Sequence, residues 1–375
     1  MKIIIAASHR FHLLDLAKTL ALQGHDVKFY SYLSAKRQQK FGLEKKNTKS
    51  LLVIMSPLLF LVKFSKRAHW AIRMQNLVLD YYMSFFIPRC DVYIALGTVY
   101  YKSFKAAKSK YNALTILEWG SKHIIEENKK ITENSDKHSF KKWIIDRSIK
   151  GYNCVDKISI ASEHVLESFL LHGYKLENFI INPYGVDLHS FHSTVLKKDP
   201  FDIIFVGGWS YRKGCDIIVN VLKDGPYTFL HVGSIVDLTF PALSNFTHVD
   251  SVNQLNLINY YSKARIFILL SRTEGLAMVQ AQAIACGLPV VCTKNTGGRD
   301  LRNLLTDKKW IIETKDNTKE EIINCINDAL KIAKTQQGER NYAHDDIENM
   351  SWEAYGKRYS DILNNLKEFR NNIDV

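Results

Sequence analysis

Short apolar runs of strand type alternate with amphipathic, helix-forming stretches along the first half of the chain. The apolar runs that predict strands lie at residues 2–7, 26–32, 91–96, 113–117, 157–161 and 179–182. Helices are expected between several of them, over about residues 10–23, 98–110, 138–150 and 162–172. This alternation is typical of a parallel sheet covered by helices, so the first half is predicted to be an α/β domain.

The same alternation starts again after a turn-rich break at 182–187 and a polar linker at 194–200. Strands are expected at 202–206, 228–232, 265–270, 289–292 and 310–313, and helices near 214–223, 253–263, 276–286 and 318–334. These strands are nearly continuous apolar runs, as in a sheet covered on both faces. Two such blocks predict two Rossmann-like domains facing across a cleft, at residues 1–190 and 200–350.

Composition narrows the class of protein. The 375 residues are enough for two domains, and the net charge of +13 favours an anionic partner: nucleic acid, a phosphorylated substrate or an anionic membrane surface. The six cysteines form no C-x-x-C pair and are typical of a reduced, cytoplasmic protein. The apolar run at the N-terminus is too short for a signal peptide.

One apolar segment, LLVIMSPLLFLV at 51–62, is too short to cross a bilayer, which takes about 20 residues. Basic and aromatic side chains flank it: Lys36, Arg37, Lys40, Lys45, Lys46 and Lys49 before it, and Lys63, Lys66, Arg67, His69, Trp70 and Arg73 after it. This pattern suits an anionic membrane interface, and equally a buried helix with solvated basic flanks. Both interpretations stay open.

Two strand-to-helix turns of the second block carry candidate chemistry. After the strand at 202–206, Gly207 and Gly208 allow a ligand to approach the backbone, and Arg212 and Lys213 add positive charge. After the strand at 265–270, Glu274 stands in a turn that feeds a helix. Such turns present backbone N–H groups at the carboxyl edge of the sheet, where a diphosphate binds well.

A third polar turn follows the strand at 113–117 in the first block, EWGSKH at 118–123. Ligands of open α/β sheets bind at this edge, so its charged and histidine side chains are candidates for a substrate site, or for capping the next helix. The chain has no H-E-x-x-H sequence, which argues against a zinc site of that type.

The second half resembles the retaining glycosyltransferases of the GT-B fold, family four (group 1 glycosyltransferases). EGLAMVQAQAIACGLPVV at 274–291 resembles the family's Glu-x7-Glu run with its A-x-G-x-P-V-V end. FVGGWSYRKGCD at 205–216 is similar to the phosphate-binding F-V-G-R-x-x-x-x-K-G-x-D, and INPYGVDLHSF at 181–191 to the linker. Ser351-Trp352-Glu353 fits the start of the last helix. These matches span residues 180–360.

The resemblance implies an α/β protein of the GT-B fold, whose last helix, about 352–375, crosses back to the first domain. It implies retaining transfer of a hexose-type sugar from a nucleotide-diphosphate sugar, UDP- or GDP-linked, without a metal or cofactor. Lys213 and Arg212 would stabilise the departing diphosphate, and Glu274 would hold the donor sugar. The other implied donor contacts are Gly207, Gly208, Gly275, Leu276, Ala277 and Gln282. Glu118, Ser121 and His123 are the acceptor-side candidates.

The chain departs from the family pattern at two positions. Gln282 replaces the second glutamate of the Glu-x7-Glu run, which usually hydrogen-bonds the ribose. An amide keeps an acceptor and adds donors. Gly208 replaces the arginine that follows V-G, and Arg212 is the candidate substitute. Either change predicts an altered donor choice or a weakened enzyme.

We therefore expect a glycosyltransferase that adds a sugar to a saccharide or glycolipid acceptor in bacterial surface polysaccharide synthesis. It would work in the cytoplasm or peripherally on the inner face of the plasma membrane. A nucleotide-sugar epimerase of the same fold and a non-catalytic nucleotide-sugar-binding subunit are the alternatives. Nucleic acid is not an expected partner, because the basic residues are spread out and no recognition motif is present.

Overall fold

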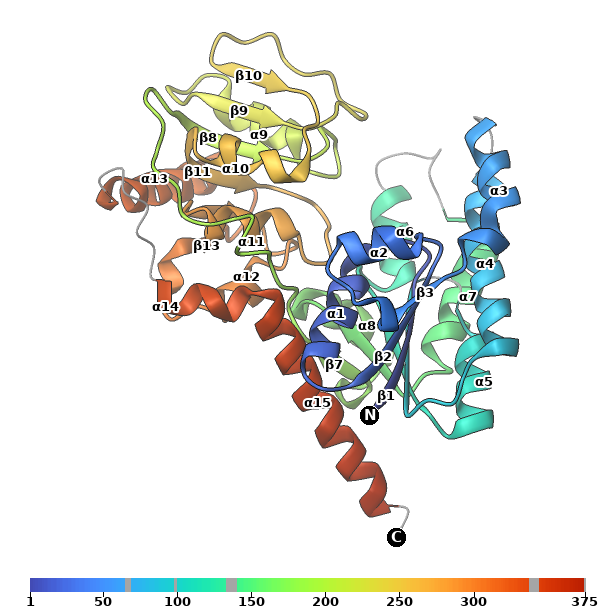
Figure 1. Ribbon diagram of the computed structural model, residues 1–375. Coiled ribbons are helices and arrows are strands. Elements are labelled where there is room, and N and C mark those ends of the chain that lie inside the picture. Colours follow the sequence, from blue (N-terminus) through green and yellow to red (C-terminus); the bar gives the residue numbers. More distant parts are fainter. Residues whose placement is uncertain (65–68, 98–99, 133–139, 337–343, 374–375) are drawn as a thin grey trace. The chain divides into compact units, whose positions relative to one another are not determined.

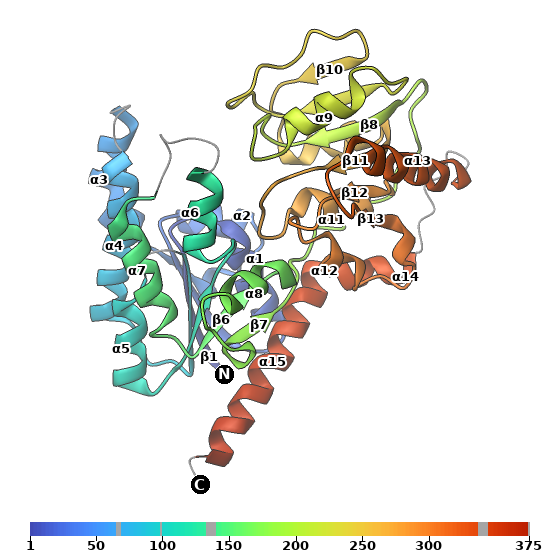
Figure 2. The same cartoon turned by 180° about the vertical axis from the view of Figure 1, so that it is seen from behind.

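The computed structural model describes residues 1–64, 69–97, 100–132, 140–336 and 344–373 (Figures 1 and 2). The chain divides into two compact units. Unit 1 comprises Met1–Ile160, Phe169–Asn182 and Tyr355–Val375, and unit 2 comprises Ala161–Ser168 and Pro183–Ala354. Each unit is built around a parallel sheet with helices on its faces (Figure 1).

Unit 1 holds a seven-stranded sheet in the order β3-β2-β1-β4-β5-β6-β7. Its strands are β1 (Lys2–Ala6), β2 (Asp26–Ser31), β3 (Thr48–Ser50), β4 (Val92–Leu96), β5 (Leu114–Glu118), β6 (Lys157–Ile160) and β7 (Phe179–Ile181). Central strands β1 and β4 are buried on both faces, which explains their continuous apolar runs.

Helices cover the sheet of unit 1. They are α1 (Phe11–Leu22), α2 (Ala35–Lys40), α3 (Leu52–Phe64), α4 (His69–Phe86), α5 (Lys102–Tyr111), α6 (Ile124–Thr132), α7 (Lys142–Tyr152) and, from Tyr355 onward, α15 (Trp352–Ile373); α8 (Glu163–Leu170) is shared with unit 2. Gly356 of α15 lies against Thr19 of α1, and a Cβ atom there would come within 2.2 Å of the Thr19 side chain. The last helix is thus part of the first unit.

Unit 2 holds a six-stranded sheet in the order β10-β9-β8-β11-β12-β13. Its strands are β8 (Phe201–Val206), β9 (Phe229–Val232), β10 (Phe246–Val249), β11 (Ala264–Leu269), β12 (Val290–Cys292) and β13 (Ile311–Glu313). Its helices are α9 (Cys215–Leu222), α10 (Ile258–Tyr261), α11 (Met278–Ala285), α12 (Gly298–Arg302), α13 (Lys319–Thr335) and α14 (His344–Ile347). From the central strands, the chain passes through α9 toward one edge and through α11 toward the other. Right-handed crossovers therefore place these two helices on opposite faces.

Most predicted elements are confirmed, with ends shifted by one or a few residues. The predicted glycine stops are confirmed too: Gly24 (φ +86°) ends α1, and Gly287 (φ +81°) ends α11 and donates to the Ile284 carbonyl at 2.8 Å. Two edge strands, β3 and β10, were not predicted. The helix expected over 253–263 is wrong in extent, because residues 254–256 form a 3-10 turn and α10 has only four residues.

The segment at 36–90, which was not assigned from the sequence, forms α2, β3, α3 and α4. Lys66 and Arg67 of the predicted basic flank lie outside the described residues, as do the side chains of Lys63, His69, Trp70 and Arg73. In α3 and α4, Val53, Phe60 and Phe85 are well exposed, so the segment is not a fully buried helix.

Candidate functional site

The candidate donor site lies where two neighbouring strands of unit 2 end. Strands β8 and β11 pair side by side, and Ile203 and Ile204 face Ile266 and Phe267. The chain leaves β8 toward β9 and leaves β11 toward β12, in opposite directions across the sheet. This is a topological switch point, where the carboxyl ends of the strands leave a crevice for a ligand.

At this point Glu274 meets the two cations of the other turn. One carboxylate oxygen, Oε1, lies 2.7 Å from Lys213 Nζ and 2.9 Å from Arg212 Nη1. The side chains of Glu274 and Lys213 are 12% and 14% exposed, whereas that of Arg212 is 50% exposed. The structure therefore brings together the three residues predicted to be catalytic, in one partly buried cluster.

The charge state of Glu274 follows from its surroundings. Burial by itself would raise the pKa of this carboxyl, but the positive charges of Lys213 and Arg212 outweigh burial and hold the pKa below its ordinary value. Glu274 is therefore ionised at neutral pH. The site presents a carboxylate between two cations, and a bound anion would compete with that carboxylate for them.

Close backbone packing fixes the two turns against each other. Gly214 (φ +71°) begins α9, and a Cβ atom there would lie 2.0 Å from the Leu270 carbonyl oxygen. No other residue fits at this approach. Arg272 makes a two-point ion pair with Asp216, at 2.7 Å for both bonds, and lies over the Tyr211 ring at 3.6 Å. Lys213 and Glu274 are thus held by a rigid frame.

Two further residues support Glu274, and no motif marked them in the sequence. Ser162 Oγ donates to the Gly275 carbonyl at 2.7 Å, and His164 Nε2 lies 2.9 Å from the Glu274 carbonyl oxygen. Both belong to the segment 161–168, which groups with unit 2 although it lies about 110 residues earlier in the chain. Every residue has a backbone carbonyl, so a side chain that contacts one cannot be recognised from the type of residue it contacts.

Glycine occurs at the two positions after β8 for different structural reasons. Gly207 has φ +146°, a conformation that favours glycine. Gly208 has an ordinary φ, but a Cβ atom there would lie 2.9 Å from Val236 Cγ2. The 234–236 loop is tied to this turn, since Trp209 N–H donates to Ser234 O at 2.8 Å and Val236 N–H to Trp209 O at 3.1 Å. The loop thus occupies the space where the family arginine would begin.

The remaining predicted donor contacts lie beside Glu274. Gly275, Leu276 and Ala277 are buried, and Ala277 N–H donates to the Thr296 carbonyl at 3.0 Å. Gln282 is 5% exposed, and its Oε1 accepts from the Tyr261 hydroxyl at 3.2 Å. The amide at the second glutamate position therefore already has a partner in the protein. Its contact with a ribose stays a prediction.

The three acceptor-side candidates lie in unit 1 and have different surroundings. Glu118 is buried at the end of β5, and its oxygens accept from Tyr359 Oη at 2.6 Å and pair with His12 Nε2 at 2.9 Å. His123 is buried and stacks on His172, and burial lowers its pKa to about 4. Ser121 is half-buried. As found, Glu118 and His123 serve packing, and their contact with an acceptor stays a prediction.

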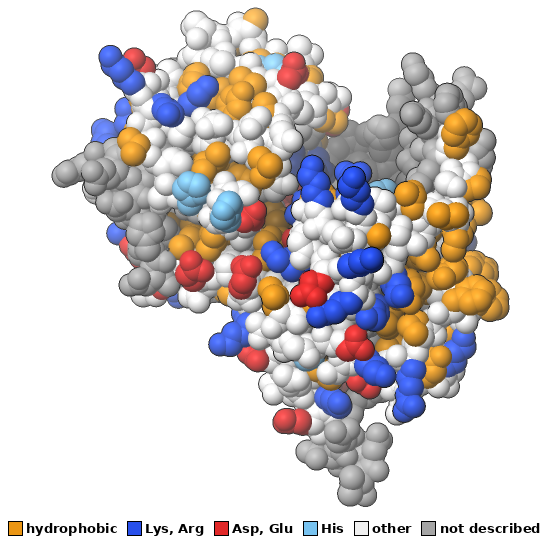
Figure 3. Space-filling model, viewed as in Figure 1, with side chains coloured by type: hydrophobic (Ala, Val, Ile, Leu, Met, Phe, Trp, Pro, Cys, Tyr) orange, Lys and Arg blue, Asp and Glu red, His pale blue; other side chains and the backbone are white. Residues whose placement is uncertain are grey.

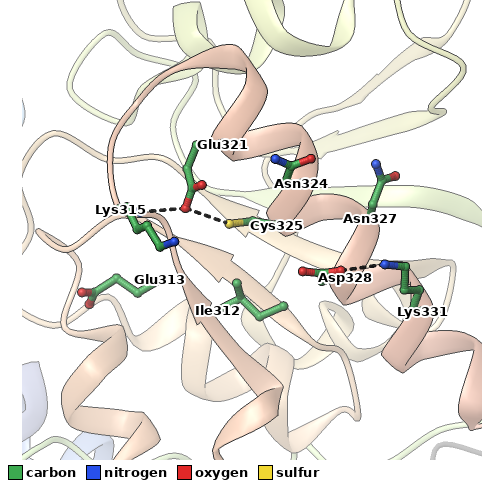
Figure 4. A pocket seen from close by; sticks show the side chains of 9 residues that line it. All are labelled: Ile312, Glu313, Lys315, Glu321, Asn324, Cys325, Asn327, Asp328 and Lys331. Carbon is green, nitrogen blue, oxygen red and sulfur yellow. Dashed lines mark hydrogen bonds and ion pairs between the residues drawn. The ribbon is translucent and has the colours of Figure 1, made fainter.

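A hollow of unit 2, of about 540 Å³, lies between β13 and α13 (Figure 4). Glu321 accepts there from the Lys315 N–H at 3.1 Å and from Cys325 Sγ at 3.6 Å, and Lys331 pairs with Asp328 at 2.9 Å. Its lining comes from neither of the two turns that hold Lys213 and Glu274. This hollow is therefore separate from the candidate donor site.

Two curated relatives match parts of this chain. An uncharacterised glycosyltransferase of Methanocaldococcus jannaschii is 25% identical over 136 residues, which are 33% of this chain and 38% of the relative. An uncharacterised 41.2 kDa protein in the cps region of Klebsiella pneumoniae is 29% identical over 101 residues, 26% of this chain and 28% of the relative. The matches thus span about a third of each relative's length.

Solved structures resemble the whole chain. Sucrose-phosphate synthase from Thermosynechococcus elongatus has a TM-score of 0.64 at 14% identity, with 98% of this chain and 99% of that chain covered. Anabaena HepE in complex with UDP-glucose has a TM-score of 0.61 at 14% identity, with 97% and 100% covered. Residues 189–346, which include both turns of the candidate donor site, match the model described as Glycosyl transferases group 1. The second unit of the chain therefore resembles the group 1 glycosyl transferases, and the fold of the chain is that of the GT-B glycosyltransferases.

Proposed function

We propose that this protein is a retaining glycosyltransferase that moves a hexose-type sugar from a nucleotide-diphosphate sugar to a saccharide acceptor. The observation that carries the proposal is the Glu274 carboxylate between Lys213 and Arg212 at the switch point of unit 2. A nucleotide-diphosphate sugar needs both elements. Its diphosphate needs positive charge, and its sugar hydroxyls need an acceptor.

Lys213 is the main cation for the diphosphate in this proposal. As the bond between the sugar and the diphosphate breaks, negative charge builds up on the leaving phosphate. A fixed, partly buried ammonium group stabilises that charge more than an exposed one does. Lys213 is mostly buried, whereas the half-exposed Arg212 is screened by water and contributes less. The two protein cations take the charge-stabilising role, so the proposal includes no metal ion.

Glu274 is proposed to hold the hydroxyl groups of the donor sugar. When the diphosphate takes over Lys213 and Arg212, the carboxylate oxygens become free to accept hydrogen bonds from those hydroxyls. The donor is proposed to be UDP- or GDP-linked, and support for UDP comes from the UDP-glucose that a structural relative binds. The exchange of partners at Glu274 would couple binding of the diphosphate to orientation of the sugar.

A second candidate, a non-catalytic nucleotide-sugar-binding subunit, is favoured by one observation. Gln282 replaces the ribose-binding glutamate of the family pattern, and its Oε1 is already bonded to the Tyr261 hydroxyl. Such a subunit would bind the nucleotide without turnover. Transfer measurements separate the two functions.

A thermal-shift screen against UDP-, GDP-, ADP- and CMP-sugars tests the proposal, because a ligand that binds the folded state raises its stability. We expect one nucleotide class to stand out, and donor turnover to fall about 100- to 1000-fold in Lys213→Ala. Lys309→Ala, a lysine paired with Asp307 in the same unit, is the matched control and should behave as wild type. A folded wild type that binds no donor, or that turns over no faster than Lys213→Ala, would refute the proposal.

The acceptor is proposed to be a lipid-linked saccharide of a surface polysaccharide, reached at the inner face of the plasma membrane. The cps region named for one relative supports the polysaccharide part. Among the described residues, no helix combines the length and apolar character that a bilayer crossing requires. Attachment would therefore rest on a surface of the protein.

The surface that supports this attachment is formed by α3 and α4 of unit 1 (Figure 3). Val53, Phe85 and Phe86 are 85%, 69% and 66% exposed, and the described residues that line the groove there are apolar side chains and tyrosines. Lys102 Nζ lies 4.0 Å over the Tyr81 ring, and Lys110 Nζ donates to the Phe85 carbonyl at 3.1 Å. Apolar side chains beside lysines suit an anionic lipid interface.

Vesicle co-sedimentation tests this part separately. The wild type should bind phosphatidylglycerol vesicles more tightly than phosphatidylcholine vesicles, and Phe85→Ser with Phe86→Ser should weaken binding. The double variant Leu171→Ser with Leu176→Ser, at two exposed apolar positions elsewhere in unit 1, is the matched control. Equal binding of all three proteins, or none to either vesicle, would argue against a membrane surface here.

A further inference from the structure

Behind the turn that holds Lys213, two histidines of neighbouring strands form a chain of hydrogen bonds. His231 on β9 and His248 on β10 are directly opposite each other in the register of the sheet. Their Nδ1 atoms lie 2.9 Å apart, and the Nε2 atom of His231 lies 2.8 Å from the Gly207 carbonyl oxygen. The chain of contacts therefore ends on the backbone of the glycine pair.

These contacts fix the tautomers of both rings. A carbonyl oxygen only accepts, so His231 Nε2 must carry the proton and donate it to Gly207. The other nitrogen of the neutral ring, Nδ1, then accepts from His248 Nδ1–H. His231 is fully buried and is stacked on Phe205 at 5.5 Å, and burial lowers its pKa to about 4. It therefore stays a neutral donor at physiological pH.

The direction of the Gly207 carbonyl determines the direction of the next N–H. The peptide bond from Gly207 to Gly208 is planar and trans, so its C=O and N–H point in opposite directions. The carbonyl points inward to His231, close to Gly233, where a Cβ atom would lie 2.0 Å from it. The Gly208 N–H consequently points away from this packed side. Within the described part of the chain it donates to no acceptor.

We propose that His231 is a positioning residue for the donor diphosphate: its Nε2–H holds the Gly207 carbonyl so that the Gly208 N–H binds a phosphate oxygen. This inference rests on the proposed function. It adds a neutral backbone donor to the charge of Lys213. It also gives the chain, which has glycine in place of the family arginine, a second contact for the phosphates from the same position.

The aromatic cluster around His231 holds its imidazole ring, and with it the Nε2–H group, in a fixed position. Trp209, Phe205 and Phe240 surround the ring, with centroids 5.0, 5.5 and 5.7 Å away. Gly207 N–H also donates to the Val232 carbonyl at 3.0 Å, so the turn is held to β9 on both sides of the glycine. A backbone N–H group that does not have to reorganise when a phosphate binds gives more affinity than a mobile one.

Three variants and one spectrum test the inference. His231→Phe keeps an aromatic ring and removes the donor, whereas His231→Gln keeps an N–H near the position of Nε2. Ile326→Ala is the stability control, because it removes buried side-chain atoms from α13 of the same unit, outside the aromatic cluster. Affinities for UDP, GDP and ADP are measured by calorimetry on the full chain.

We expect His231→Phe to weaken binding of the preferred nucleoside diphosphate by about 10- to 100-fold, as loss of a hydrogen bond to a charged group does. His231→Gln should recover most of that loss, and Ile326→Ala should lower the melting temperature while leaving affinity unchanged. Unchanged affinity in His231→Phe would overturn this inference alone. A wild type that binds none of the three diphosphates would overturn the proposed function with it.

A measurement on the wild type keeps the test independent of how the variants fold. The nitrogen NMR shifts of His231 should show the tautomer protonated at Nε2 at neutral pH. The tautomer protonated at Nδ1 would overturn the inference, because such a ring does not donate to Gly207.

Discussion

The Glu274 carboxylate lies 2.7 Å from the Lys213 ammonium group, and each side chain comes from the turn after a different central strand of unit 2. This pair neutralises charge that the proposed reaction uses on two different parts of the donor. Binding of the donor must therefore break this pair. Variants that remove only one of its members should separate diphosphate binding from sugar transfer.

Glu274→Gln should lower sugar turnover by at least about 100-fold while leaving the affinity for the free nucleoside diphosphate equal or higher. The amide removes the negative charge that competes with the diphosphate for Lys213 and Arg212. Turnover assays and calorimetry with the same preparation measure the two effects. Parallel loss of turnover and diphosphate affinity would contradict this division of roles.

Gly208→Arg should restore the family arginine only when space is made for it. The first side-chain atom at this position meets Val236 Cγ2 at 2.9 Å, so Gly208→Arg alone should lower stability. In a Val236→Ala background, the arginine should raise diphosphate affinity by about tenfold, as one charge-assisted hydrogen bond does. Val236→Ala alone is the control, since this side chain is 62% exposed. If Gly208→Arg alone and Gly208→Arg with Val236→Ala bind the diphosphate equally well, the 234–236 loop is not what keeps an arginine out of position 208.

Asp300 should make unit 2 less stable as the pH rises from 5 to 8. Burial raises the pKa of its carboxyl to about 7, well above its value in the unfolded chain. At pH values between the pKa of the unfolded chain and the pKa of the folded state, the folded state binds more protons, so the free energy of unfolding falls with increasing pH. Asp300→Asn keeps an acceptor for the Glu163 N–H, which now bonds Oδ1 at 2.8 Å.

Urea unfolding at pH 5 and pH 8 measures this effect. The variant should gain stability relative to wild type between the two values, on the order of 1–3 kcal/mol. The same difference between the two proteins at both pH values would contradict the raised pKa.

Tyr359→Phe should destabilise unit 1 by about 1–3 kcal/mol, because it leaves a buried Glu118 oxygen without the donor it now has at 2.6 Å. Tyr227→Phe removes a hydroxyl from an exposed bond to Asn327 and should cost less than about 0.5 kcal/mol. Hydrogen exchange separates the units, and loss of protection should be confined to unit 1. Equal effects of the two substitutions would mean that Glu118 finds another partner.

The sequence predicts the central strands well because strands such as β1 and β11 are buried on both faces and therefore form continuous apolar runs. The two missed strands lie at sheet edges. Thr48–Ser50 is short and polar, and in Phe246–Val249 only Phe246 is fully buried. At an edge, pairing with one neighbouring strand stabilises a segment whose own side chains show no strand pattern.

The candidate site was predictable where a turn's composition carries the chemistry, as at Lys213 and Glu274. It was not predictable where the function of a residue depends on what lies opposite it. His231 is an ordinary strand residue in the sequence, and only the register with β10 and the closeness of Gly207 give it a role. The hydrogen bond of Glu118 was not predictable for the same reason, since its partner Tyr359 lies 241 residues away.

Unit 1 includes residues from Tyr355 onward, and this affects the order in which the protein is completed during synthesis. All residues of unit 2 leave the ribosome before Tyr359 does. Until then, Glu118 of the N-terminal sheet lacks one of its buried partners, although the whole sequence of the later unit has already been made. Nascent chains usually fold from the N-terminus onward; here the first unit to be started is the last to be finished.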